Sequence, residues 1–164
     1  MPDTPEWLPP LVLFETYNGN WEKYLNVLYD FFSEDFITSN PSYRGVKLSL
    51  KRHPIIQGKE ATFWHIISEG RAEDERVPDL RRCERIRWPR PIIENPEAPI
   101  LKIWENKRNG EKRICLWLEQ QEYLVILAER KGYILLWTAF CVTLSHQKRK
   151  LEREFRAFKA GTAP

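Results

Sequence analysis

Apolar residues gather in four short runs between residues 100 and 142, and three turn signals separate these runs. Asn109-Gly110 lies between the first two runs, Gln120-Gln121 between the next two, and Lys131-Gly132 between the last two. Asn-Gly is a strong signal for a tight hairpin, because both central residues of the turn need a positive φ. Connections this short leave no room for helical crossovers. The pattern therefore predicts a four-stranded antiparallel meander.

The residues before this sheet follow other periods. Apolar residues recur every three or four positions from Trp21 to Phe36, which predicts an amphipathic helix with Asn20 as its N-cap. Short helices are predicted for residues 59–69, ended by Gly70 at C′, and for residues 78–87. The remaining segments are predicted to be a short edge strand (11–14), a strand or extended cover (46–50), and loops (71–77 and 89–99).

A last amphipathic helix is predicted after the sheet. Ser145 is its candidate N-cap, and Leu151, Phe155 and Phe158 form an apolar stripe on an otherwise basic helix. N-terminal helices packed on a four-stranded antiparallel meander, followed by this helix, predict an α+β fold. At 164 residues the chain is expected to be a single domain, with an acidic helical layer (1–44) and a core (45–158).

Charge is distributed unevenly along the chain. Residues 1–45 carry two basic and seven acidic side chains, a net charge of −5, and the remainder has a net charge of +8. A basic body favours a polyanionic partner, because cations replace the counterions of phosphates. The alternative is a solvated surface of mixed charge. The acidic segment could screen the basic part, or could complete the core as a helical layer.

Several classes of function and location are not favoured by the sequence. Three cysteines without a CxxC pair are typical of a reducing compartment, so a cytoplasmic protein is expected. The N-terminus lacks the basic and apolar regions of a secretory signal, and no apolar run approaches the about 18–20 residues of a membrane helix. No phosphate-binding glycine loop, zinc motif or carboxylate cluster is present, so no metal or cofactor is expected.

One histidine has an informative position. On a helical projection of residues 59–69, Phe63, Trp64, Ile66 and Ile67 cluster on one side, and His65 falls nearly opposite. His65 is therefore predicted to face solvent, where an imidazole can give or take a proton near neutral pH. The alternative is a surface histidine without a role.

A dense basic and aromatic cluster follows this helix. Residues 81–90 contain five arginines and Trp88. Guanidinium groups bind phosphate with two parallel hydrogen bonds, and Trp88 could stack on a base. The alternative is a solvated helix face paired with Glu84 and the acidic loop before it. Thr138 is the only polar residue in the last predicted strand, where threonine is also simply a good strand former.

Four segments in this order resemble a known family. They are the helix GKEATFWHI, the Arg-rich helix ending in RIRW, the strand YLVIL and the strand ending in WTAF. Together they resemble the phage-associated branch of the barnase–EndoU–colicin–RelE-like group of metal-independent ribonucleases. The resemblance covers about residues 45–158.

The resemblance implies a toxin-like endoribonuclease. In such an enzyme the 2′-hydroxyl of RNA attacks the adjacent phosphorus and leaves a 2′,3′-cyclic phosphate, without a metal. Carried over by position, His65 would be acid or base, Arg82 and Arg85 would hold the phosphate, and Thr138 would donate a hydrogen bond to a phosphate oxygen. The residues expected to contact RNA are Arg81, Arg87, Trp88 and Arg113.

The second proton-transfer group stays open, since His53 and His146 are both available. The resemblance also implies an inhibitory antitoxin or immunity protein as a partner beside RNA. The rival hypothesis is a non-catalytic RNA- or protein-binding module of a mobile genetic element. A structural or adaptor protein of such an element is a third.

Overall fold

The long strands of the fold are those predicted between residues 100 and 142. The computed structural model describes residues 4–161 and contains β5 (Leu101–Arg108), β6 (Glu111–Leu118), β7 (Tyr123–Arg130) and β8 (Tyr133–Cys141). Each strand is antiparallel to the next. Asn109 and Gly110 have φ values of 54° and 77°, as the predicted hairpin turn requires.

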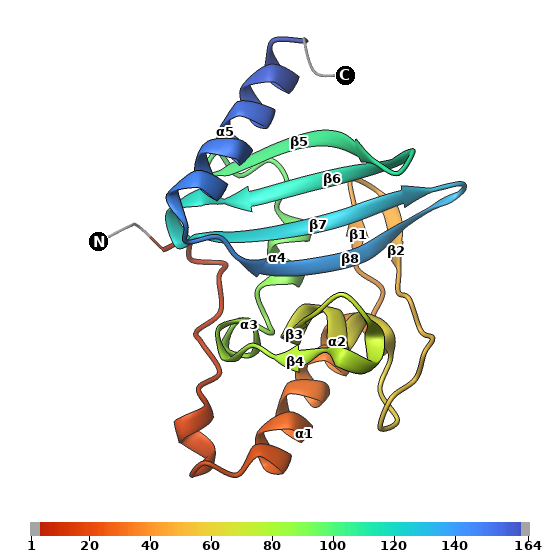
Figure 1. Ribbon diagram of the computed structural model, residues 1–164, viewed down its shortest axis with the longest axis vertical. Helices are drawn as coiled ribbons and strands as arrows, with labels where there is room; N and C mark the ends of the chain where they lie inside the picture. The colour runs from red at the N-terminus through yellow and green to blue at the C-terminus, as the bar shows by residue number, and fades with distance from the viewer. Residues whose placement is uncertain (1–3, 162–164) are drawn as a thin grey trace.

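The sheet is larger than predicted and is mixed. Two more strands, β1 (Ser42–Tyr43) and β2 (Val46–Ser49), extend it to six strands in the order β1-β2-β8-β7-β6-β5. Leu48 of β2 pairs in parallel with Ile134 of β8, so the prediction of a purely antiparallel four-stranded sheet is wrong (Figure 1). A parallel pairing between segments so distant in sequence leaves no turn signal between them.

The N-terminal helix forms as predicted. Asn20 accepts a hydrogen bond from the Lys23 amide at 3.1 Å and caps α1 (Trp21–Phe32), which continues as a π-helical segment, η2 (Ser33–Ile37). The edge strand predicted for residues 11–14 is absent from the described chain. Phe14 instead begins a 3₁₀ turn, η1 (Phe14–Tyr17).

The middle segments are shorter and more varied than predicted. Helix α2 (Ala61–Ile67) ends before Gly70, because β3 (Ser68–Glu69) pairs with β4 (Val77–Pro78). Gly70 therefore has φ +140° in a turn and is not a helix cap. A 3₁₀ turn, η3 (Glu73–Glu75), and two helices, α3 (Leu80–Glu84) and α4 (Pro89–Glu94), follow. Helix α4 occupies the segment predicted as a loop, since a proline fits the first helical position.

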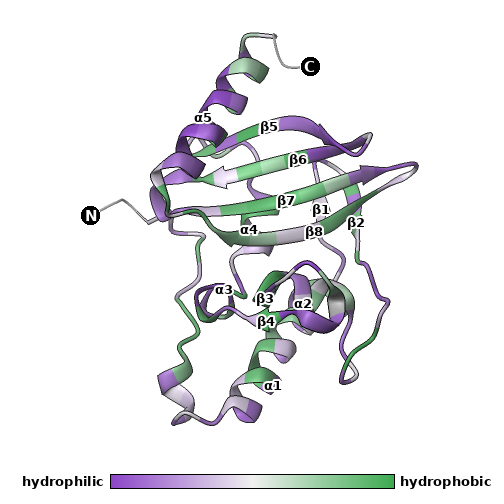
Figure 2. Ribbon diagram, in the orientation of Figure 1, coloured by the Kyte–Doolittle hydropathy of each residue, from purple (hydrophilic) through white to green (hydrophobic). Residues whose placement is uncertain are grey.

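The sheet separates two hydrophobic cores. The larger core packs α1, α2 and α4 against one sheet face, and Leu28, Phe63 and Val125 belong to it. The smaller core packs Leu151 and Phe155 of α5 (Ser145–Lys159) on Trp104 and Trp117 of the other face. Figure 2 shows apolar strands and a polar outer side of α5. Ser145 is not the N-cap of α5; Leu144 holds that position without a side-chain bond.

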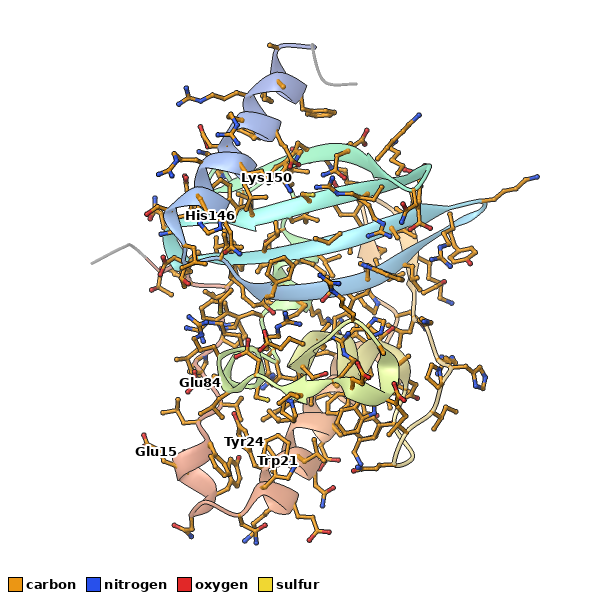
Figure 3. The ribbon with its side chains drawn as sticks, in the orientation of Figure 1. Glu15, Trp21, Tyr24, Glu84, His146 and Lys150 are labelled. Atoms are coloured by element: carbon orange, nitrogen blue, oxygen red, sulfur yellow. The ribbon has the colours of Figure 1, made fainter. Side chains whose placement is uncertain are left out.

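The acidic N-terminal third contributes to the larger core. Tyr24, Leu28 and Phe32 of α1 are fully buried; Figure 3 labels Tyr24 among the side chains of this helix. Helix α1 is therefore a layer of the larger core. Among residues 4–161, no helix is both long and apolar enough to cross a bilayer.

Candidate functional site

Helix α2 is held firmly at both of its sides. The Thr62 hydroxyl accepts a hydrogen bond from the Lys51 amide at 2.7 Å, which ties the helix to the segment after β2. The Trp64 indole donates to the Ile56 carbonyl at 3.0 Å. Phe63 meets Phe32 of α1 edge to face, with 5.4 Å between ring centroids. These contacts place the C-terminal end of α2 beside β8 (Figure 1).

His65 is buried, so the prediction that it faces solvent is wrong. Its exposure is 6%, and its ring meets Trp137 of β8 edge to face at 5.6 Å between centroids. The helical projection failed because α2 has protein on two opposite sides. Phe63 and Ile66 face the larger core, and the opposite side, which carries His65, lies against β8.

Three predicted site residues meet at one backbone oxygen. The His65 carbonyl accepts hydrogen bonds from the Thr138 hydroxyl at 3.1 Å and from Arg82 Nη1 at 3.1 Å. Arg76 Nη2 donates to the same carbonyl at 3.3 Å, and both guanidinium groups also donate to the Ser68 carbonyl. Cations and donors at the C-terminus of a helix satisfy its last carbonyls and oppose its dipole. The arrangement joins α2, α3, β8 and the residue before β4.

A β-bulge in β8 shapes the surface beside this cluster. Ile126 pairs with Thr138 and Leu127 pairs with Leu136, so Trp137 has no partner in the β7 ladder. The bulge reverses the alternation of β8. Ala139 and Cys141 join the larger core, whereas Thr138 and Phe140 reach the opposite sheet face. In a regular strand, Thr138 would lie on the same sheet face as Leu136, toward the larger core.

The result is a hollow between β8 and the segments α2, β3 and α3, which we call the α2 hollow. It is lined by His65, Glu69, Gly70, Arg71, Arg76, Arg82, Trp137, Thr138 and Phe140. Three arginines against one glutamate make it basic. Arg82 also lies over the Phe140 ring at 5.4 Å and 3.5 Å from an oxygen of Asp79. The hollow thus combines an imidazole, a hydroxyl, guanidinium groups and two aromatic rings.

Arg85 and Trp88 do not belong to this hollow. Arg85 donates to the Arg81 carbonyl at 2.9 Å and lies over the Trp88 ring at 5.1 Å. Trp88 is only 6% exposed, and its indole donates to the Pro9 carbonyl at 2.9 Å. The expectation that Trp88 stacks on a base is therefore wrong, because the N-terminal segment and Tyr123 cover the ring.

The other predicted RNA contacts are scattered. Arg87 lies 3.9 Å from carboxylate oxygens of both Glu34 and Asp35 and covers the Phe31 ring at 4.5 Å. Acids of the N-terminal third thus neutralise Arg87 rather than the hollow. Arg81 is exposed on α3.

Arg113 borders the α2 hollow from the sheet. Its guanidinium lies over the Trp137 ring at 4.6 Å and 2.8 Å from Glu111. Of the two histidines left open as a second proton-transfer group, His53 is exposed in the segment before α2. His146 is exposed on the first turn of α5 (Figure 3), and neither lines the α2 hollow.

Six residues that line the hollow were not among the predicted site residues, and three of them carry its chemistry. Arg76 ends the charged segment that was predicted as a loop, and Trp137 and Phe140 stand in the WTAF segment on either side of Thr138. Their position depends on the bulge and on the β3–β4 pair. Both features lack a local signal. In the part of the chain from 4 to 161, no group of three histidine, cysteine, aspartate or glutamate residues is placed to hold a metal ion.

Comparison of the chain with models of protein families, with curated proteins and with solved structures finds no match. The functional argument therefore rests on the chemistry of the hollow.

Proposed function

We propose that the chain is a metal-independent endoribonuclease whose cleavage centre is the α2 hollow. The observation that carries the proposal is the convergence of three side chains from distant segments. His65 of α2, Arg82 of α3 and Thr138 of β8 line one basic hollow. Two rings in the same hollow, Trp137 and Phe140, offer stacking surfaces for bases.

The proposed reaction is an internal transesterification. The 2′-hydroxyl loses its proton, its oxygen bonds to the adjacent phosphorus, and the 5′-oxygen leaves with a proton. The products are a 2′,3′-cyclic phosphate and a 5′-hydroxyl. His65 would transfer a proton, and Arg82 and Arg76 would stabilise the negative charge of the pentacoordinate phosphorus. Thr138 would turn its one hydroxyl proton from the His65 carbonyl, which keeps two guanidinium donors, to a phosphate oxygen.

A second candidate function is supported by the same contacts. His65 is 6% exposed, and both Arg76 and Arg82 donate hydrogen bonds to backbone carbonyls. A surface of this kind can bind a phosphate chain without performing chemistry. An RNA-binding module that does not cleave is therefore the alternative. In both cases an inhibitory protein partner would have to cover the α2 hollow.

The test is incubation of the purified protein with RNA in excess EDTA, followed by detection of cyclic-phosphate ends. We expect cleavage by the natural chain and a loss of at least about 100-fold in His65→Gln, which keeps a polar side chain of similar size. His53→Gln and His146→Gln are matched controls at exposed positions and should cleave normally.

Intact RNA with tight, salt-sensitive binding would reject the nuclease and support the binding module. Intact RNA without binding would reject both. Equal loss in all three variants would show that the assay does not report on the α2 hollow.

A further inference from the structure

A second hollow lies between α5 and strands β5 to β8; we call it the α5 hollow. Its volume is about 230 Å³. Pockets for drug-sized ligands have about 300–1,000 Å³, so this one has room for a single small ring system. Its apolar lining consists of Cys115, Leu124, Ile126, Phe140, Val142 and Leu151.

Cations surround this apolar floor. Arg108, Arg113 and Lys150 line the hollow, and Lys150 lies on α5 one turn from His146 (Figure 3). One carboxylate, Glu154, is also present. It accepts hydrogen bonds from the Trp104 indole at 3.2 Å and from Asn106 at 2.9 Å, and it lies 3.7 Å from Arg108. Glu154 and Arg108 therefore balance each other, so a phosphate at this hollow would depend on Lys150.

The two hollows are neighbours on one surface. Phe140 lines both, and Arg82 of the α2 hollow lies over its ring. Arg113 lines the α5 hollow and covers Trp137, which lines the other. In single-stranded nucleic acid, flat bases alternate with charged phosphates. Such a strand can place its bases on the rings and its phosphates beside the cations.

We propose that the α5 hollow is a second nucleotide subsite for single-stranded RNA, and this inference rests on the proposed function. One base enters the apolar floor beside Phe140, and Lys150 holds an adjoining phosphate. The next nucleotides along the strand then reach the α2 hollow. The protein therefore prefers single strands of several nucleotides over dinucleotides, which occupy the α2 hollow alone.

The test measures binding of a short 2′-O-methyl RNA oligonucleotide, which lacks the attacking hydroxyl and cannot be cleaved by this route. Fluorescence anisotropy over a range of salt concentrations gives its affinity. Lys150→Glu should weaken binding about tenfold at low salt and lower the salt slope by about one. Arg149→Glu, the same charge change at the next position of α5 outside the hollow, should weaken binding by less than about threefold.

A second pair of variants changes shape without changing charge. Gln147 is exposed and lines the α5 hollow, so Gln147→Trp fills the hollow and should also weaken binding. His146→Trp places the same ring outside it and should not. Because all four positions are exposed on α5, the fold is not at risk. Turnover of a dinucleotide should be unchanged in the two control variants, Arg149→Glu and His146→Trp.

The subsite would be overturned if Lys150→Glu weakened binding no more than Arg149→Glu, and Gln147→Trp no more than His146→Trp. It would also be overturned if the oligonucleotide did not bind. Competition by polyglutamate as strong as that by RNA of equal charge would overturn it too, since an acidic protein would then be the better partner. Cleavage of RNA without any difference between Lys150→Glu and Arg149→Glu would leave the nuclease and reject the subsite. Lys150-dependent binding without cleavage would reject the nuclease and leave the subsite.

Discussion

The hydroxyl of Thr138 donates a 3.1 Å hydrogen bond to the backbone carbonyl of His65, 73 residues earlier in the chain. The bond joins the bulge of β8 to the last turn of α2. Arg82 donates to the same carbonyl, so the contact that gathers the proposed catalytic groups is also part of the fold. Variants in the α2 hollow must therefore be judged on stability and on chemistry together.

Removal of the Thr138 hydroxyl should affect both. Thr138→Val keeps the shape but deletes the donor, and the His65 carbonyl keeps two guanidinium donors. We therefore expect a loss of only about 1 kcal/mol in the free energy of unfolding, measured with urea. If the hydroxyl turns from this carbonyl to a phosphate oxygen when RNA binds, RNA cleavage should fall about tenfold or more in the variant.

Thr138→Ser is the control, because it restores a hydroxyl at the same place. It should recover most of the cleavage even where its smaller side chain lowers stability. A serine variant as inactive as the valine variant would mean that the hydroxyl has no role in the reaction.

The strands and the first helix could be predicted because their signals are local. Asn109-Gly110 specifies a hairpin, and the spacing from Trp21 to Phe32 specifies an amphipathic helix. The parallel pairing of β2 with β8 and the bulge at Trp137 depend on contacts between distant segments. The face on which Thr138 lies could not be read from the alternation alone.

The residues of the candidate site could be found in part from the sequence. His65, Arg82 and Thr138 were selected by residue type and order, and they line one hollow. The burial of His65 and Trp88 could not be predicted from residue type and order. A helical projection assumes one covered side, whereas α2 lies between the larger core and β8, and Trp88 lies beneath the N-terminal segment.

The two arginines at the end of α2 should be energetically coupled. Arg76 and Arg82 both donate to the Ser68 carbonyl, and Ser68 is fully buried. Either arginine can serve this carbonyl when the other is removed. We expect Arg76→Gln and Arg82→Gln together to cost about 1 kcal/mol more than the sum of the single changes.

Urea unfolding of the four proteins completes this double-mutant cycle. A combined loss smaller than the sum would contradict the expectation. It would mean that repulsion between the two cations outweighs their shared hydrogen bonding.

Substitutions at two tryptophans should have different effects, one on the affinity for RNA and the other on the stability of the fold. Trp137→Leu removes a stacking surface from the α2 hollow, and RNA affinity should fall about tenfold, since stacking contributes about 1–3 kcal/mol per base. Trp88→Phe removes the bond to Pro9 and should lower stability by about 1 kcal/mol with unchanged affinity. Anisotropy and urea unfolding measure the two quantities. If Trp88→Phe lowered the RNA affinity and Trp137→Leu did not, Trp88 would be part of the RNA-binding surface.

Asp35 should make the stability of the protein depend on pH. Burial raises the pKa of its carboxyl from 3.8 to about 6, although Arg87 and Arg90 oppose this shift. The folded state therefore binds a proton more tightly than the unfolded chain. The contribution of Asp35 to stability is complete below about pH 4 and is lost as the pH rises through 6.

Asp35→Asn should remove this loss, because the amide is neutral at every pH. The pKa difference corresponds to about 3 kcal/mol, and screening by solvent reduces the expected gain at pH 7 to about 1–2 kcal/mol. The measurement is the difference in unfolding free energy between the two proteins from pH 4 to 7.5, with Asp30→Asn on the exposed side of α1 as control. The difference should grow with pH for Asp35 and stay near zero for Asp30. A variant that is less stable at pH 7 would show that the carboxylate is held charged by Arg87.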